Sequence, residues 1–132
     1  MKQLSVFLSN EAGTLLKVLD LLGEAGVQLY AISIADTDTY GICRIICDKP
    51  DEADALLIKA GYAVSESDVR AIKIGDKPGA AADIIRIFAR EHLSIAYLYT
   101  FLYEGAPVLV FRTDDKEKAS AIIERNKLES LG

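Results

Sequence analysis

The pattern of the chain repeats after 66 residues, so that residues 1–66 align with residues 67–132 from end to end without a gap. In each copy a glycine precedes apolar residues at helical spacing. The apolar residues after Gly13 are Leu15, Val18, Leu19 and Leu22, and those after Gly79 are Ala81, Ile84, Ile85 and Phe88. The chain is therefore predicted to form two domains of the same fold, residues 1–66 and 67–132.

Each copy contains four segments suited to strands and two suited to helices. The predicted strands are residues 4–8, 28–36, 40–47 and 62–65 in the first copy, and 69–74, 94–103, 107–113 and 128–131 in the second. The second helix of each copy contains the apolar pairs Leu56-Leu57 and Ile122-Ile123. Before it, Asp48-x-x-Asp51 and Asp114-x-x-Glu117 resemble capping boxes. The element order is βαββαβ, twice.

A unit with this order folds most simply as a four-stranded antiparallel sheet with both helices on one face, which is the ferredoxin-like arrangement of the α+β class. Residues 37–39 and 104–106 are predicted to be the hairpin turns. One face of each sheet is left without helices, and a copy of this size buries only a thin core. We therefore expect the domains to associate and the protein to form a homodimer or a higher assembly.

The net charge of -5 argues against two classes of partner. An acidic protein repels nucleic-acid phosphates and anionic membrane surfaces, so neither is expected to bind. The longest uncharged stretch, residues 93–103, is too short to span a membrane, and the N-terminus shows no export signal. These observations predict a location in the cytoplasm.

No catalytic or metal-binding constellation is visible in the sequence. The single histidine, His92, falls at a predicted helix end, and Cys43 and Cys47 share a strand face with Ile45 in the manner of core residues. We therefore expect no cofactor, no metal and no enzymatic activity. An enzyme of this topology would need a convergent arginine or a carboxylate pair, for which Arg44 is the only candidate.

A polar turn precedes the first helix of each copy. Asn10 and Asp76 each stand three residues before a glycine, Gly13 or Gly79. Free N–H groups of a first helical turn can hold a carboxylate, while Asn10 or Asp76 can accept hydrogen bonds from an ammonium group. The turn therefore suits a free amino acid. On these residues alone, the favoured interpretation is an ordinary turn or N-cap, with the glycines required by the backbone geometry.

The repeated turn, together with Gly26-Val27-Gln28-Leu29-x-x-Ile32-Ser33 and His92-Leu93-Ser94-Ile95-x-x-Leu98 after the first helices, resembles the ACT domain. The resemblance covers nearly the whole chain as a tandem pair without a catalytic domain. It implies a regulatory module that binds an amino acid at the interface between two ACT domains, through the turn and the start of the second strand. The implied ligand-binding residues are Asn10, Glu11, Ala12, Gly13, Thr14, Leu15, Gln28, Leu29, Asp76, Pro78, Gly79, Ser94 and Ile95.

Four aromatic residues alternate along one predicted strand and therefore share one of its faces. They are Tyr97, Tyr99, Phe101 and Tyr103. If this face is turned to the helices, the rings belong to the core. If it is turned to the bare side, the rings form a patch suited to a dimer surface or a ligand wall.

The leading functional hypothesis is a stand-alone regulatory protein that binds a free amino acid and signals through a change of assembly. The alternative is a non-catalytic regulatory or structural subunit that binds a biosynthetic enzyme without a small ligand. We expect the first copy to be the better site because Thr14 and Gln28 add polar groups where the second copy has Ala80 and Ser94.

Overall fold

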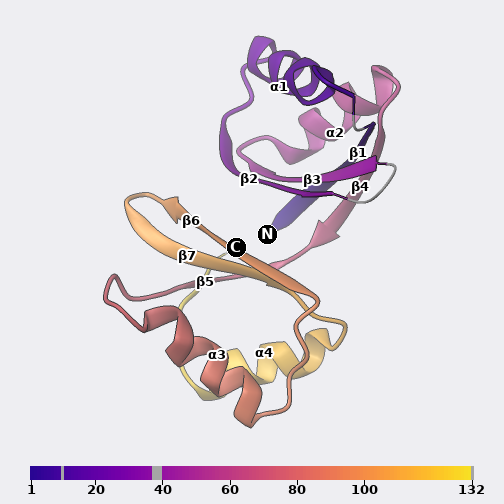
Figure 1. The fold of residues 1–132 in the computed structure, drawn as a ribbon. Helices are drawn as coiled ribbons and strands as arrows, with labels where there is room; N and C mark the ends of the chain where they lie inside the picture. Colours follow the sequence, from indigo (N-terminus) through magenta and orange to yellow (C-terminus); the bar gives the residue numbers. More distant parts are fainter. Residues whose placement is uncertain (10, 37–39, 132) are drawn as a thin grey trace. The chain divides into compact units, whose positions relative to one another are not determined.

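The computed structural model describes residues 1–9, 11–36 and 40–131. The chain divides into two compact units, one comprising Lys2–Ser67 and the other Met1 with Asp68–Gly132 (Figure 1). Met1 belongs to the second unit because its carbonyl oxygen accepts a hydrogen bond of 2.9 Å from the Val69 amide.

The first unit has the order expected from the sequence. It consists of β1 (Lys2–Ser9), α1 (Thr14–Glu24), β2 (Leu29–Asp36), β3 (Tyr40–Cys47), α2 (Pro50–Lys59) and β4 (Ala63–Asp68). The sheet order is β2-β3-β1-β4, and β3 runs antiparallel to both β1 and β2. The predicted turn at residues 37–39 lies outside the described residues.

The second unit repeats this topology. It consists of β5 (Arg70–Lys73), α3 (Ala80–Arg90), β6 (Tyr97–Tyr103), β7 (Ala106–Arg112), α4 (Lys116–Arg125) and β8 (Ser130–Leu131). The sheet order is β6-β7-β5-β8, with β7 antiparallel to β5 and β6, and β5 antiparallel to β8. In Figure 1, α3 and α4 lie on one face of this sheet. The prediction of two ferredoxin-like units is confirmed.

In each unit, alternate side chains along the strands face the helices and form one core between the sheet and its helices. In the first unit, Cys43, Ile45 and Cys47 pack with the buried residues of α1 and α2, as expected for core cysteines. In the second unit, Phe88 of α3 and Phe111 of β7 lie with their ring centroids 4.8 Å apart. These contacts hold the helices against one face of each sheet.

The predicted capping boxes are wrong in detail. Helix α2 begins at Pro50 without a side-chain cap, because the Asp48 carboxylate instead accepts a hydrogen bond of 2.8 Å from the Gln28 amide. Helix α4 is capped by Asp115, one residue later than expected, whose carboxylate accepts a hydrogen bond of 3.0 Å from the Lys118 amide. At both helix starts, the hydrogen bond that the carboxylate accepts from a backbone amide therefore differs from the predicted capping box.

The aromatic side chains of β6 lie on the helix-free face of their sheet. Residues paired across antiparallel strands share a face, and Leu98 pairs with Phe111 while Thr100 pairs with Leu109. Leu109 and Phe111 belong to the helix-covered core. The four rings named above therefore point to the opposite side, which is the alternative that suits a binding surface.

Candidate functional site

The two polar turns before α1 and α3 have the same backbone geometry. Gly13 and Gly79 are left-handed, with φ of 88° and 87°. The Thr14 amide donates to the Glu11 carbonyl oxygen over 3.3 Å, and the Ala80 amide donates to the Lys77 carbonyl oxygen over 3.1 Å. The sequence repeat is thus also a repeat of local structure.

Each turn leaves two helix amides available to a ligand. In α3, the N–H groups of Ala81 and Ala82 donate to no acceptor in the described part of the chain, because the first helical hydrogen bond is that of Asp83 to Gly79. The amides of Leu15 and Leu16 are equally open among the described residues of the first unit. Such groups favour a negatively charged partner.

Two cavities flank the second turn. One, of about 550 Å³, lies between residues 74–82 and the β6–β7 hairpin and is lined by Ile74, Gly75, Lys77, Gly79, Ala80, Ala81, Ala82, Thr100, Phe101, Leu102 and Pro107. The other, of about 450 Å³, is lined by Lys73, Ile74, Gly75, Asp76, Lys77, Pro78, Ala80, Asp83 and Ile84. Either is large enough for a small metabolite.

Asp76 stands at the second of these cavities with an exposed carboxylate that makes no hydrogen bond or ion pair with the described residues. It does not cap α3, whose N-cap is Gly79. In the first unit the corresponding residue, Asn10, lies outside the described residues. The Ser9 and Thr14 hydroxyl oxygens lie 3.1 Å apart across that turn.

Within a unit, the residues at the start of the second strand lie far from the turn. The second turn adjoins Leu102 and Pro107 at one end of the sheet, whereas the Ala96 amide bonds the Arg112 carbonyl oxygen at the other end. The part of β6 from Tyr97 to Leu102 alone spans about 17 Å, and Ser94 lies three residues before the strand begins. Gln28 and Leu29 are likewise at the opposite end from the first turn, because Leu29 pairs with Cys47.

The strand-start residues have partners of their own. The Gln28 side-chain amide donates to the Leu29 carbonyl oxygen over 3.2 Å, and the Ser94 carbonyl oxygen accepts a hydrogen bond of 2.8 Å from the Thr113 hydroxyl. Ile95 packs against the core of the second unit. One unit therefore does not bring the turn and the strand start together around a single ligand.

The groups with displaced pKa values lie away from the turns. Burial raises the pKa of the Cys43 thiol to about 11 and also raises that of Cys47. The hydrogen bond and charge of Lys2, whose Nζ lies 2.7 Å from the Asp51 carboxylate, lower the pKa of Asp51. Among the described residues, no group of three His, Cys, Asp or Glu side chains is placed to hold a metal ion.

A family model described as an ACT domain pair matches residues 1–132. The chain belongs to the ACT domain family. ACT domains are amino-acid-binding regulatory domains and are generally not catalytic. None of the helices in the described ranges has the length and apolar character needed to cross a membrane.

Solved structures of similar proteins agree with this assignment. A protein from Bacteroides thetaiotaomicron is 32% identical over 98% of this chain and 90% of its own, with a TM-score of 0.91. Regulatory subunits of aspartate kinase from Thermus thermophilus and Thermus flavus are both 16% identical over 94% of this ACT domain pair. They are covered to 91% and 90%, with TM-scores of 0.65 and 0.61, and share its fold. No curated protein matches the chain.

Sequence reasoning found the turn of the ACT domain pair but not the cavity beside it. Free amides of a first helical turn were expected, but Ala81 and Ala82 were not named, and the Lys77 side chain and the Thr100–Leu102 wall were missed. The run of three alanines after Gly79 was the available signal, because small side chains at a helix start leave its amides accessible.

Proposed function

We propose that this ACT domain pair is a regulatory protein that binds a free amino acid at the turn before α3. The observation that carries the proposal is the pair of unbonded amides, Ala81 and Ala82, lining the cavity of about 550 Å³. They would receive the ligand carboxylate at the positive end of the helix dipole. The Asp76 carboxylate lines the adjoining cavity of about 450 Å³ and makes no hydrogen bond or ion pair with the described residues. It would receive the ammonium group of a ligand that extends across Lys77 and Ala80, which line both cavities.

The choice of the second turn rests on side-chain size. Ala81 and Ala82 occupy the positions that Leu15 and Leu16 occupy in the first copy. Leucine side chains restrict approach to the amides beneath them, whereas alanines leave the space open. Lys77, on the rim, adds a positive charge where the first copy has Glu11. Both differences favour an anionic group at the second turn, contrary to the preference drawn from Thr14 and Gln28.

A second copy of the chain would complete this site. Strand β6 is the outermost strand of its sheet, and antiparallel pairing of β6 with β6 of a second copy places the start of one strand beside the end of the other. Ser94 and Ile95 of the second copy would then approach the turn at residues 75–79. The site residues that lie at opposite ends of the sheet within a unit would thus become neighbours in a dimer.

This arrangement would couple the ligand to assembly. A ligand held by groups from two copies binds the dimer more tightly than the monomer and therefore shifts the equilibrium toward the dimer. The signal to a partner would be the change in assembly or in the exposed surface that accompanies it.

The test is calorimetric titration of the intact chain with each of the twenty amino acids. At least one is expected to bind, and Asp76→Ala should weaken its binding about ten- to a hundredfold, as for loss of a hydrogen bond to a charged group. Asp20→Ala, which removes an exposed carboxylate from α1, is the matched control and should leave the affinity unchanged. No heat and no thermal shift with any amino acid would disprove the proposal.

The first turn is tested separately through Asn10→Ala. Loss of affinity only in Asn10→Ala would move the site to the first copy. Loss in both single variants, with two ligands bound per chain, would show that both copies bind. If neither variant alters the affinity of a ligand that does bind, the turns are structural and the ligand lies elsewhere.

A second candidate is a regulatory subunit that binds a biosynthetic enzyme and no small ligand. Exposed apolar side chains on the edge strands favour it as much as they favour dimer formation, since Leu102 is 70% and Ile34 51% exposed. Co-purification of a stoichiometric enzyme from native cells, together with a negative amino-acid titration, would select this alternative.

A further inference from the structure

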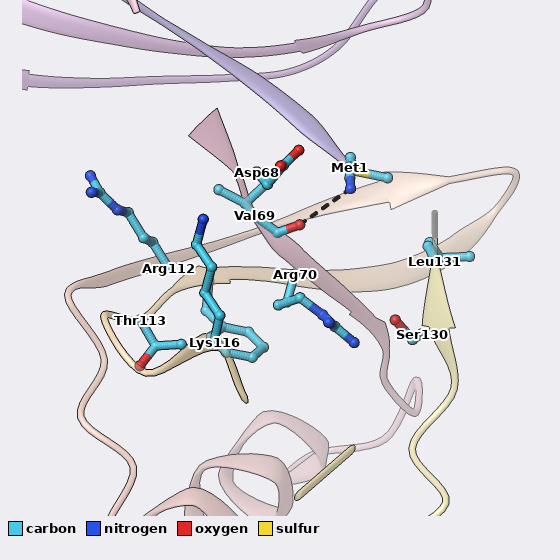
Figure 2. A pocket seen from close by; sticks show the side chains of 10 residues that line it. Met1, Asp68, Val69, Arg70, Arg112, Thr113, Lys116, Ser130 and Leu131 are labelled. Carbon is cyan, nitrogen blue, oxygen red and sulfur yellow. Dashed lines mark hydrogen bonds between the residues drawn. The ribbon is translucent and has the colours of Figure 1, made fainter. Parts of the chain in front are cut away.

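A third cavity, of about 400 Å³, lies at the end of the second unit opposite to its turn. It is bounded by the start of β5, the end of β7, the first residue of α4 and the edge strand β8. Figure 2 shows the side chains of Arg112 and Lys116 extending to the same side of the sheet, while Arg70 extends toward Ser130. The remaining lining residues are Met1, Asp68, Val69, Phe111, Thr113 and Leu131.

The lining carries an excess of positive charge. Arg70, Arg112 and Lys116 line this space, and Asp68 is the one carboxylate among the lining residues. Arg70 pairs with the core residue Phe111 and Arg112 pairs with Tyr97, so the two arginines border the cavity from opposite faces at the end of the sheet. In the described chain, Arg112 and Lys116 form no ion pair, and the Arg70 guanidinium donates a hydrogen bond of 2.8 Å to the neutral Ser120 hydroxyl. Unneutralised cations around one cavity in a protein of net charge -5 favour an anionic ligand.

Comparison of the two copies shows that these cations are not part of the shared fold. Sixty-six positions earlier, Leu4, Ile46 and Pro50 stand in place of Arg70, Arg112 and Lys116. Leu4 and Ile46 are buried apolar residues in the same topology. The shared backbone therefore does not require any of the three charges, and Arg112 and Lys116 form no ion pair with the described residues.

We propose that this cavity binds a small molecule with two anionic groups on a short chain. One group would lie between Arg112 and Lys116, and the other would reach Arg70 around the end of the sheet, where the Ser120 hydroxyl helps to fix the Arg70 guanidinium. Asp114 and Asp115 line a different cavity, of about 300 Å³, with His92 and Lys118. The site is independent of the amino-acid site proposed above.

Calorimetry on the intact chain with three probes, at constant ionic strength, tests the proposal. Glutarate and phosphoglycolate each carry two anionic groups, and acetate carries one. We expect the two dianions to bind at least about tenfold more tightly than acetate. The tighter of the two assigns the site to dicarboxylates or to phosphorylated acids. Equal affinity of all three probes, or no binding at all, would overturn the proposal.

Variants at the exposed cations locate the site without endangering the fold. Arg112→Gln and Lys116→Gln should each weaken binding of the better dianion about tenfold, and Asp68→Asn should strengthen it about threefold. Arg90→Gln, which removes an exposed charge from the end of α3, is the control and should change nothing. If Arg90→Gln weakens binding as much as Arg112→Gln, or if Asp68→Asn weakens it, the cavity is not the binding site.

Discussion

At the scale of single residues, the two glycines at the helix starts adopt a left-handed backbone and leave open space where a side chain would lie. Gly13 and Gly79 have φ values of 88° and 87°, and a Cβ atom at either would meet none of the described atoms within 4 Å. A side chain there is opposed by the left-handed backbone, which costs an ordinary residue about 1–2 kcal/mol. Local geometry thus requires glycine at these positions even without a ligand.

Helix α1 allows this conclusion to be tested with two alanine substitutions in one element. Gly13→Ala should lower the free energy of unfolding by about 1–2 kcal/mol because of the backbone conformation. Gly23→Ala, at a position without positive φ and with free space around it, should raise it by about 0.5–1 kcal/mol through better helix propensity. Urea denaturation of both variants gives the two values, and changes of the same sign would refute the assignment.

Cys43 makes stability depend on pH at the alkaline end. Burial raises the pKa of its thiol from 9.0 to about 11, so folding favours the neutral thiol. This contribution is complete below pH 9.0 and is lost as the pH rises toward 11. A shift of this size corresponds to roughly 2–3 kcal/mol.

The expected result is a decrease in the free energy of unfolding between pH 9 and 11 that is smaller in Cys43→Val, which cannot ionise at this position. Denaturation series of the two proteins at matched pH give this difference. Other groups that titrate in the same pH range affect both proteins alike and cancel in it. Identical pH profiles would show that the thiol does not titrate as its burial indicates.

The residues of the turn could be predicted from sequence, whereas those of the cavity wall could not. Asp76 and Gly79 lie within four residues of each other, and their spacing is a local signal. Thr100 and Leu102 reach the cavity that Gly79 lines only because β6 pairs with β7 and β7 with β5. Such a contact depends on sheet register, which the apolar pattern sets only together with the turn geometry of each hairpin.

At the scale of elements, the alternation along β6 predicted two faces but not which of them the helices cover. The decision follows from the hairpin register, because Thr100 lies opposite Leu109 of the core. The same register leaves Leu98 on the helix side yet 44% exposed, since β6 is the edge strand. An edge strand with exposed apolar side chains is a ready surface for a further strand.

The matched edges of the two copies test which one forms the dimer. Leu98 on β6 and Ile32 on β2 are separated by 66 positions and are 44% and 43% exposed. Because the proposed site requires pairing through β6, Leu98→Lys should convert the dimer to a monomer, while Ile32→Lys should not. Light scattering at micromolar concentration measures both masses. A monomeric wild-type protein, or a reversed order of the two variants, would contradict β6 pairing.

At the scale of the whole molecule, the two copies share one backbone fold but present different surface residues. The copies share element order, sheet topology and turn geometry, but the second copy has small residues at its turn and cations at its opposite end. The repeat made the fold easy to predict because every element was seen twice. Its functional differences lie in the positions where the copies disagree, such as Arg70 against Leu4.

If the ligand is held by two copies of the chain, assembly and binding must be linked reciprocally. A saturating amino acid should then lower the dimer dissociation constant by the same factor by which dimer formation raises ligand affinity, on the order of tenfold for a coupling of about 1.4 kcal/mol. Sedimentation of a dilution series with and without ligand measures this factor. Asp76→Ala should abolish the effect of the ligand while leaving the ligand-free dimer constant unchanged, because the exposed Asp76 carboxylate makes no hydrogen bond or ion pair with the described residues. Leu98→Lys should weaken both dimer formation and ligand binding. A ligand that binds the Leu98→Lys monomer with full affinity would show that one unit suffices, and the site would then lie within the cavity beside Ala81 and Ala82 alone.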